Sequence, residues 1–488
     1  MRESGILMHI SSLPGPYGIG TMGEEAYKFV DFLAAAGQRY WQILPLSPTG
    51  YGDSPYQAFS TFAGNQYLID PGLLQQQDLL TEEELSSFDW GHGNRVDYGK
   101  LHRERETLLR LAFRRFAPSP DYEAFLQQNP WLREYGLFMA IKSRFEGKSW
   151  HSWPAPLRMR EQEAMDQWAQ ELEEDIHYLS FVQYQFHRQW HTLKQYANER
   201  GIQIIGDVPI YVPLDSADVW ANPSLFCLDE NRRPQMVAGC PPDSFSADGQ
   251  LWGNPLYDWD KMKKQDYCWW IQRLAAAVQM YDVVRLDHFR GFKDYWAIPA
   301  GDATAINGKW MPGPGMDFIR AMHKAFPGKL FIAEDLGFVT PEVRQLQTDS
   351  GYPGMKVLEF AFDSREAGNY LPHLYPTNSV CYTGTHDNAT LKQWFDEAAP
   401  QDVEQAKDYL GLHEEEGYVW GMIRGAMSSI SDLCIVQMQD YLQLGGEARM
   451  NVPGTLSASN WSWRAEPGFE TEALADKIWQ ITRRYGRI

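Results

Sequence analysis

The chain has 488 residues, of which 44% are hydrophobic and 22% charged, a composition typical of a folded protein with a large core. Its formal net charge of −20 argues against nucleic acid and anionic membrane as partners, because both repel an acidic surface. No apolar run approaches the roughly 20 residues of a membrane helix, no signal-peptide pattern is visible, and five widely spaced cysteines form no CxxC pair, so we expect a cytoplasmic protein.

Short apolar, β-branched runs that end in polar residues recur along the chain and predict buried strands. The eight runs are Gly5–Ser11, Tyr40–Leu44, Gln203–Val208, Val283–His288, Leu330–Asp335, Lys356–Phe360, Ser379–Thr383 and Cys434–Gln437. Most are separated by helical patterns, the first at Gly23–Gly37 and another starting at Thr340 with Pro341 in its first turn. The pattern predicts an α/β fold, a (β/α)8 TIM barrel with a closed parallel sheet.

Two segments between the expected strands are too long for a single crossover helix. Capped helical patterns predict a helical insertion at about residues 72–200, after the second strand. A smaller insertion with an active-site loop is expected at about residues 211–281, after the third strand. We therefore expect residues 1–488 to form one catalytic barrel domain with two large, mainly helical insertions.

Acidic residues stand at or near the ends of five expected strands: Asp207, Asp287, Glu334, Asp387 and Asp440. In a barrel of this kind, functional side chains gather where strands end and the following loops begin. Any one of these acids could instead cap the helix that follows its strand. Five together favour an active site rich in carboxylates.

The two-residue period of a strand predicts how these acids point. Arg285 and Asp287 share a face, and a guanidinium beside a carboxylate keeps it ionised, as a nucleophile requires. Glu334 and Asp335 point to opposite sides, and a Glu next to apolar Phe331 could be held protonated by desolvation. Two carboxyl groups with opposed protonation states are what retaining glycoside chemistry uses.

Three segments resemble the α-amylase superfamily in that family's own order. Val284–Phe289 (VRLDHF) is similar to its nucleophile strand and Ala333–Gly337 (AEDLG) to its acid/base strand. Gly384–Asn388 (GTHDN) is similar to the segment that carries its transition-state carboxylate.

Further segments resemble the amylomaltases, the disproportionating 4-α-glucanotransferases of glycoside hydrolase family 77. They are residues 47–57, 241–246, 249–257, 449–455 and 460–464. After the third strand, residues 206–212 (GDVPIYV) lack the Asn-His ending that is common in amylases, and amylomaltases share this feature. The resemblance covers about residues 5–465.

This resemblance implies transfer of α-1,4-glucan segments from a malto-oligosaccharide to the 4-hydroxyl of an acceptor glucose or glucan. It makes Asp287 the nucleophile, Glu334 the general acid and base, and Asp387 the partner of the ring hydroxyls of the distorted sugar. The expected substrate-binding residues are Arg285, His386, Tyr51, Ser54, Tyr56, Asp207, Asp243, Phe245, Trp252 and Asn451. The aromatic members of this set could also be simple loop packing.

We expect no cofactor and no metal, since no phosphate-binding loop is visible and His187 and His191, four apart on an expected solvated helix, lack a third ligand. The expected partners are malto-oligosaccharides, starch- or glycogen-derived α-1,4-glucans and glucose, bound by a monomer. Two alternatives stay open. One is an α-1,4-glucan hydrolase, and the other is an inactive glucan-binding protein, which the presence of all three carboxylates disfavours.

Overall fold

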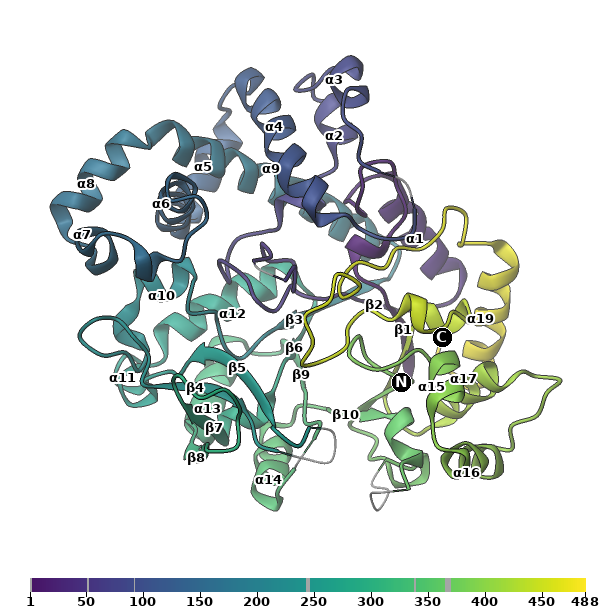
Figure 1. Ribbon diagram of the computed structural model, residues 1–488. Coiled ribbons are helices and arrows are strands. Elements are labelled where there is room, and N and C mark those ends of the chain that lie inside the picture. The colour runs from purple at the N-terminus through teal and green to yellow at the C-terminus, as the bar shows by residue number, and fades with distance from the viewer. Residues whose placement is uncertain (1, 51, 92, 243–245, 338, 365–369) are drawn as a thin grey trace.

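The computed structural model describes residues 2–50, 52–91, 93–242, 246–337, 339–364 and 370–488. At its centre, eight strands form a closed barrel in which all the paired neighbours run parallel (Figure 1). In order around the barrel they are β1 (Glu3–Leu7), β2 (Tyr40–Gln42), β3 (Gln203–Val208), β6 (Val283–Leu286), β9 (Leu330–Ala333), β10 (Gly354–Val357), β11 (Ser379–Tyr382) and β12 (Leu433–Gln437). The expected (β/α)8 barrel is confirmed.

The sixth barrel strand differs from its expected position. β10 ends at Val357, and Leu358–Phe362 forms a 3-10 helix where the sequence pattern predicts further strand. The apolar run continues through both segments, so hydrophobicity alone does not mark the end of the strand.

Apolar side chains from most of the strands fill the interior of the barrel. This cluster includes Leu7, Leu44, Ile205, Val283, Ile332, Met355, Val357, Val380, Tyr382 and Ile435. Side chains alternate along a strand, so the residues two positions after Ile205, Val283 and Ile332 face the same interior one layer higher. Those positions hold Asp207, Arg285 and Glu334. The polar layer of the site thus stands directly on the apolar layer of the barrel.

The helices outside the barrel follow the expected alternation with strands. α1 (Glu24–Ala35) begins after Gly23, and α14 (Pro341–Ser350) begins where Thr340 Oγ1 accepts a hydrogen bond from the Val343 N–H. The other helices after β6 are α13 (Gly315–Ala325), α15 (Leu391–Glu397), α16 (Pro400–Leu410), α17 (Tyr418–Ser428), α18 (Met438–Tyr441) and α19 (Glu472–Arg484).

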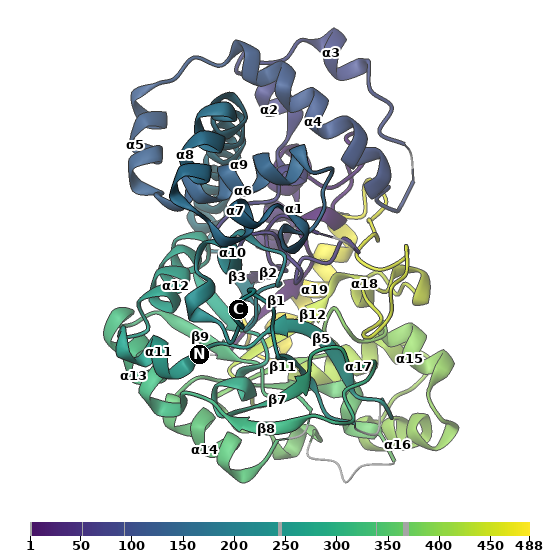
Figure 2. The same cartoon turned by 60° about the vertical axis from the view of Figure 1, so that its left-hand side comes forward.

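In the part of the chain that the structure describes, every named element between the loop after β2 and the start of β3 is a helix. The α-helices are α2 (Pro71–Gln75), α3 (Glu82–Ser86), α4 (Tyr98–Arg115), α5 (Pro120–Gln128), α6 (Trp131–Arg144), α7 (Ala155–Met159), α8 (Gln162–Glu171) and α9 (Glu173–Glu199). Most of them gather at one end of the molecule, above the barrel in Figures 1 and 2.

Two buried glutamines of α9 bind the backbone of the loop that follows β2. Gln183 accepts a hydrogen bond from the Gly64 N–H at 2.7 Å and donates to its carbonyl at 2.9 Å. Gln189 accepts from the Asp70 N–H at 2.7 Å and donates to its carbonyl at 3.1 Å. The helical segment is thereby fastened to the loop through specific pairs of hydrogen bonds.

The segment after β3 is less helical than the sequence analysis expects. Besides α10 (Ala217–Ala221), α11 (Trp259–Lys264) and α12 (Cys268–Met280), it holds β4 (Met236–Cys240) and β5 (Gln250–Pro255). These strands join β7 (Asp294–Pro299) and β8 (Lys309–Pro312) in an antiparallel sheet of order β5-β4-β7-β8, visible in front of the barrel in Figure 2. β7 lies after β6 in the chain, so the sequence between β3 and β6 alone cannot reveal that β4 pairs with β7.

The division into one catalytic domain and two inserted subdomains remains a prediction.

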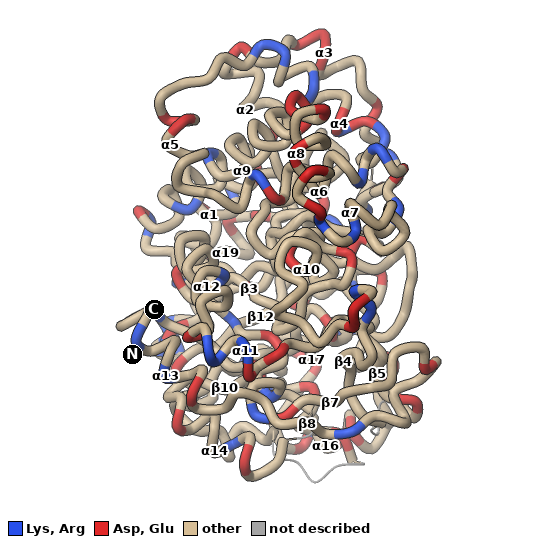
Figure 3. Tube along the Cα trace, turned by 90° about the vertical axis from the view of Figure 1, so that its left-hand side faces the viewer, with Lys and Arg blue, Asp and Glu red and all other residues tan. Residues whose placement is uncertain are grey.

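The chain termini lie side by side in Figures 1 and 2. Arg487 is fully buried there and donates hydrogen bonds to the carbonyls of Glu3, Met427 and Ser429 at 3.0, 2.8 and 2.8 Å. Lys and Arg are interspersed with Asp and Glu along the trace in Figure 3. Among the helices of the described residues, none combines the length and the apolar character that crossing a membrane requires.

Candidate active site

Three acidic side chains meet at the carboxyl end of the barrel. Asp287 directly follows β6, Glu334 directly follows β9, and Asp387 lies in the turn after β11. The Asp287 side chain is 28% exposed and that of Asp387 46%, so both are open to a ligand at the barrel mouth.

Arg285 connects two carboxylates on neighbouring strands. Its Nη1 donates to Asp207 Oδ2 at 2.6 Å and to Asp287 Oδ1 at 3.0 Å. Tyr56 donates its hydroxyl to the same Asp207 oxygen at 2.8 Å. The side chains of Arg285 and Asp207 are 5% and 1% exposed, so this ion pair is shielded from solvent. Arg285 thus holds a fixed positive charge against the more exposed Asp287 carboxylate.

Glu334 is held by backbone amides. Its Oε2 accepts from the His288 N–H at 2.7 Å and its Oε1 from the Leu336 N–H at 2.9 Å. Burial raises the pKa of Glu334 to about 8, with the negative charge of Asp287 adding to it and Arg285 opposing it. Glu334 is therefore mostly protonated at neutral pH and can serve as a general acid.

Asp335, one residue further on, points away from Glu334. Its Oδ1 accepts from the Met355 N–H at 2.7 Å, and its Oδ2 lies 3.8 Å from Lys356 Nζ. Only one carboxylate of this adjacent pair therefore faces the barrel mouth, as the alternation of side chains requires.

Hydrogen bonds to both the side chain and the backbone hold Asp387 in place. Asn451 Nδ2 donates to Asp387 Oδ1 at 2.6 Å, and Arg449 Nη2 donates to its carbonyl at 2.7 Å. His386 Nε2 lies 3.5 Å from Asp387 Oδ1, and the His386 ring stacks on Tyr56 with centroids 5.1 Å apart. The C-terminal segment thus holds the Asp387 carboxylate directly, and the loop after β2 packs against its neighbour His386.

The profile of a family described as 4-alpha-glucanotransferase, glycoside hydrolase family 77, matches residues 8–470. The chain belongs to this 4-α-glucanotransferase family. Transfer of α-1,4-glucan segments is therefore the activity of the chain, and the expected class of glycosyl-transferring enzyme is confirmed.

Relatives of the glucanotransferase family match over nearly their whole length. The 4-alpha-glucanotransferase of Clostridium butyricum is 48% identical over 98% of this chain and 100% of its own. That of Streptococcus pneumoniae serotype 4 is 48% identical over 100% of this chain and 98% of its own. Among solved structures, the amylomaltase from Streptococcus agalactiae in complex with acarbose superimposes with a TM-score of 0.97 at 41% identity, covering 100% of both chains.

Two further expected binding residues of the glucanotransferase lie near this centre. Ser54 Oγ accepts a hydrogen bond from the Tyr56 N–H at 3.2 Å and so shapes the turn that presents Tyr56. Trp252 on β5 meets the His288 ring edge-on, with centroids 4.8 Å apart. Tyr51, Asp243 and Phe245 lie outside the described residues.

Three residues without an expected role also belong to the site. The ring of Trp461 lies 5.7 Å from that of Tyr56 and 5.9 Å from that of His386. His288 has a left-handed backbone at φ 49°, which turns its N–H toward Glu334. Arg449 binds the carbonyls of Asp387 and Asn451. All three lie inside segments that resemble the family, so the resemblance could have pointed to them.

Asp440 follows β12 but takes no part in the mouth of the barrel. It is fully buried, and its two oxygens accept hydrogen bonds from Thr383 Oγ1 and the Leu391 N–H, both at 2.7 Å. This strand-end acid supports the segment after β11 instead of facing a substrate.

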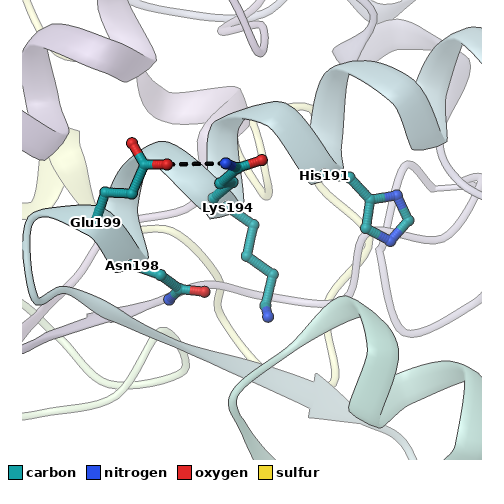
Figure 4. Close-up of a pocket in the computed structure, with 5 residues that line it drawn as sticks. His191, Lys194, Asn198 and Glu199 are labelled. Carbon is teal, nitrogen blue, oxygen red and sulfur yellow. Dashed lines mark hydrogen bonds between the residues drawn. The ribbon is translucent and has the colours of Figure 1, made fainter.

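The histidines of α9 show no metal site. His187 is not solvated as expected, because its ring packs 5.3 Å from that of Phe125, and burial lowers its pKa to about 3. In the described part of the chain, no three His, Cys, Asp or Glu side chains are placed to hold a metal ion. A shallow depression of about 510 Å³ beside α9 is lined by His191, Lys194, Gln195, Asn198 and Glu199, and contains none of the barrel-mouth acids (Figure 4).

Proposed function

We propose that Asp287, Glu334 and Asp387 perform the glucan transfer by a retaining double displacement. The observation that supports this most is the contrast between two neighbouring carboxyl groups. Asp287 accepts a hydrogen bond from the Arg285 guanidinium, whereas burial raises the pKa of Glu334 to about 8. A nucleophile needs the ionised form and a general acid the protonated form.

In the first half of the reaction, an Asp287 oxygen attacks the anomeric carbon of the donor. The bond to the 4-oxygen of the departing glucan breaks, and the Glu334 proton moves to that oxygen. In the second half, the 4-hydroxyl of an acceptor attacks the anomeric carbon, Glu334 takes its proton, and the bond to Asp287 breaks. Two inversions retain the α configuration.

The remaining side chains bind and orient the glucan in this proposal. Asp387, together with Asn451 and His386, faces the sugar ring whose bond is cleaved, because these groups offer donors and acceptors at an open carboxylate. Tyr56 and Trp252 offer aromatic faces for sugar rings. The other proposed binding residues are Arg285, Ser54, Tyr51, Asp207, Asp243 and Phe245. The amylomaltase from Streptococcus agalactiae is solved in complex with acarbose, and its close superposition on this chain supports binding of a similar ligand here.

The reaction is tested first with maltotriose as both donor and acceptor. Transfer gives glucose together with a ladder of longer oligosaccharides, resolved by chain length and without added metal or nucleotide. Steady release of glucose and maltose without longer products would instead identify a hydrolase. If maltotriose is not converted at all, the remaining alternative is an inactive glucan-binding protein.

The roles are tested with Asp287→Asn, which keeps the shape and removes the nucleophile. We expect kcat to fall by at least about 10³-fold, because the covalent step is lost. The matched control is Asp317→Asn, an exposed acid on α13 that should leave kcat unchanged. Near-normal activity of Asp287→Asn, with an intact fold by circular dichroism, would refute the assignment.

We also propose that the protein acts in the cytoplasm as a monomer, without cofactor, nucleic acid or membrane partner. All five cysteines lie in the described residues and none of them forms a disulfide there, which suits a reducing compartment. Light scattering coupled to size-exclusion chromatography tests the monomer, and a mass corresponding to two chains would contradict it.

A further inference from the structure

A buried carboxyl group lies beneath the turn that carries Asp387. Glu359 is in the 3-10 helix Leu358–Phe362, is 6% exposed, and donates its N–H to the Thr383 carbonyl at 3.3 Å. Its Oε1 is buried and has no hydrogen-bond partner among the described residues. A Cβ atom at Gly384 would lie only 2.9 Å from this oxygen, so the carboxyl group packs directly against the turn.

The charged groups around Glu359 already have other partners. Both oxygens of Asp440 accept hydrogen bonds, from Thr383 Oγ1 and from the Leu391 N–H. The Arg449 guanidinium donates to the carbonyls of Asp387 at 2.7 Å and Asn451 at 2.8 Å. An ionised carboxylate with an unpartnered oxygen is costly in such a place.

The electrostatics agree with this geometry. Burial raises the pKa of Glu359 well above its usual range, the negative charge of Asp440 raises it further, and Arg449 opposes both. Glu359 is therefore held in its neutral form as the protein folds.

We propose that Glu359 is a positioning residue for Asp387, filling the underside of the turn as an uncharged acid and leaving Arg449 on the carbonyls of Asp387 and Asn451. Loss of its proton would create a charge that competes with these carbonyls for the guanidinium. The turn would then lose the contact that fixes the Asp387 backbone. The inference rests on the proposed role of Asp387 in binding the sugar ring.

The first test measures stability and needs no substrate. The folded protein holds the Glu359 proton at pH values where the unfolded chain, with a pKa near 4.5, has lost it. Glu359 therefore contributes a fall in stability as pH rises above about 4.5, and this contribution is absent in Glu359→Gln. We expect Glu359→Gln to gain about 2 °C or more in unfolding temperature relative to wild type between pH 4 and pH 8. The control is Glu415→Gln, an exposed residue that should show no such gain.

The second test separates positioning from simple packing. Glu359→Gln should retain at least half of the wild-type kcat at pH 6, whereas Glu359→Ala should lose about tenfold with KM within twofold. As pH rises, kcat of wild type should fall further than kcat of Glu359→Gln, because only the wild-type side chain can lose a proton at this position.

Equal pH dependence of stability in wild type and Glu359→Gln would overturn the inference. So would equal loss of kcat in the Gln and Ala variants at every pH, which marks a role in packing alone. The stability result does not depend on catalysis, so it can fail while the proposed site stands. Conversely, full activity of Asp387→Asn would overturn the site without changing the unfolding data.

Discussion

Two carboxyl groups of this site lie in different surroundings. Asp287 faces the Arg285 guanidinium at 3.0 Å and is partly open to solvent. Glu334 is buried, and this burial raises its pKa to about 8 even though two backbone amides that donate to its oxygens oppose the rise. The positive charge of Arg285 is shared with buried Asp207, whose pKa burial raises even as Arg285 lowers it. Arg285 thus opposes, at both Asp207 and Glu334, the rise in pKa that burial causes.

The pKa of Glu334 predicts an alkaline limit for the enzyme. Its protonated form is the general acid, so kcat/KM for maltotriose should fall by about tenfold per unit as pH rises above about 8. With α-maltotriosyl fluoride as donor, the leaving fluoride needs no proton. The rate of the fluoride burst should then stay constant above pH 8. If the rate still falls, another group is responsible for the titration.

At the scale of elements, α9 is tied to the active-site loop by side chains that imitate backbone pairing. Gln183 makes two hydrogen bonds to Gly64, on the stretch after β2 that also presents Ser54 and Tyr56. The helical segment therefore fixes the end of a loop that carries an aromatic residue of the site.

Gln183→Leu should weaken this connection. The substitution leaves the N–H and carbonyl of Gly64 without partners, which costs about 2 kcal/mol of stability. Because Tyr56 lies on the same loop, KM for maltotriose should rise more than kcat falls. Urea unfolding and steady-state kinetics measure both effects. Gln195→Leu, at an exposed position of the same helix, is the control, and equal behaviour of the two variants would contradict the proposed link.

Features that depend on local sequence could be predicted, whereas features that join distant parts of the chain could not. The eight barrel strands and their acids could be predicted because buried runs and strand ends are local patterns, and the two-residue period aligns Ile205 with Asp207. The pairing of β4 with β7 and the stacking of Tyr56 on His386 join distant segments, so neither follows from a local pattern. The same limit applies to Asp440, because its position matches that of the other acids and only its partners show a structural role.

At the scale of the whole molecule, the barrel closes where β1 meets β12. Arg487 lies at this junction and binds carbonyls on β1, at the end of α17 and in the residue after it. A buried guanidinium with several carbonyl partners joins the first and last segments of the chain.

Arg487→Met should therefore lower the free energy of unfolding by on the order of 3 kcal/mol, because buried carbonyls lose their donors. The site lies at the opposite, carboxyl end of the strands, so kcat at 25 °C should change little. Thermal unfolding and maltotriose kinetics measure the two quantities. The control is Arg484→Met, an exposed residue of α19, and a stable Arg487→Met variant would contradict this role.

The closed barrel also determines what a cut chain could do. A break in the exposed turn at residues 230–231 would leave β1, β2 and β3 on one fragment and the other five barrel strands on the second. The Arg285–Asp207 ion pair and the Tyr56–His386 stack would then span two polypeptides. Each half alone would lack part of the mouth, and glucan transfer would return only when both halves reassociate. The protein would thus act as a split enzyme whose glucanotransferase activity indicates that its two fragments have associated.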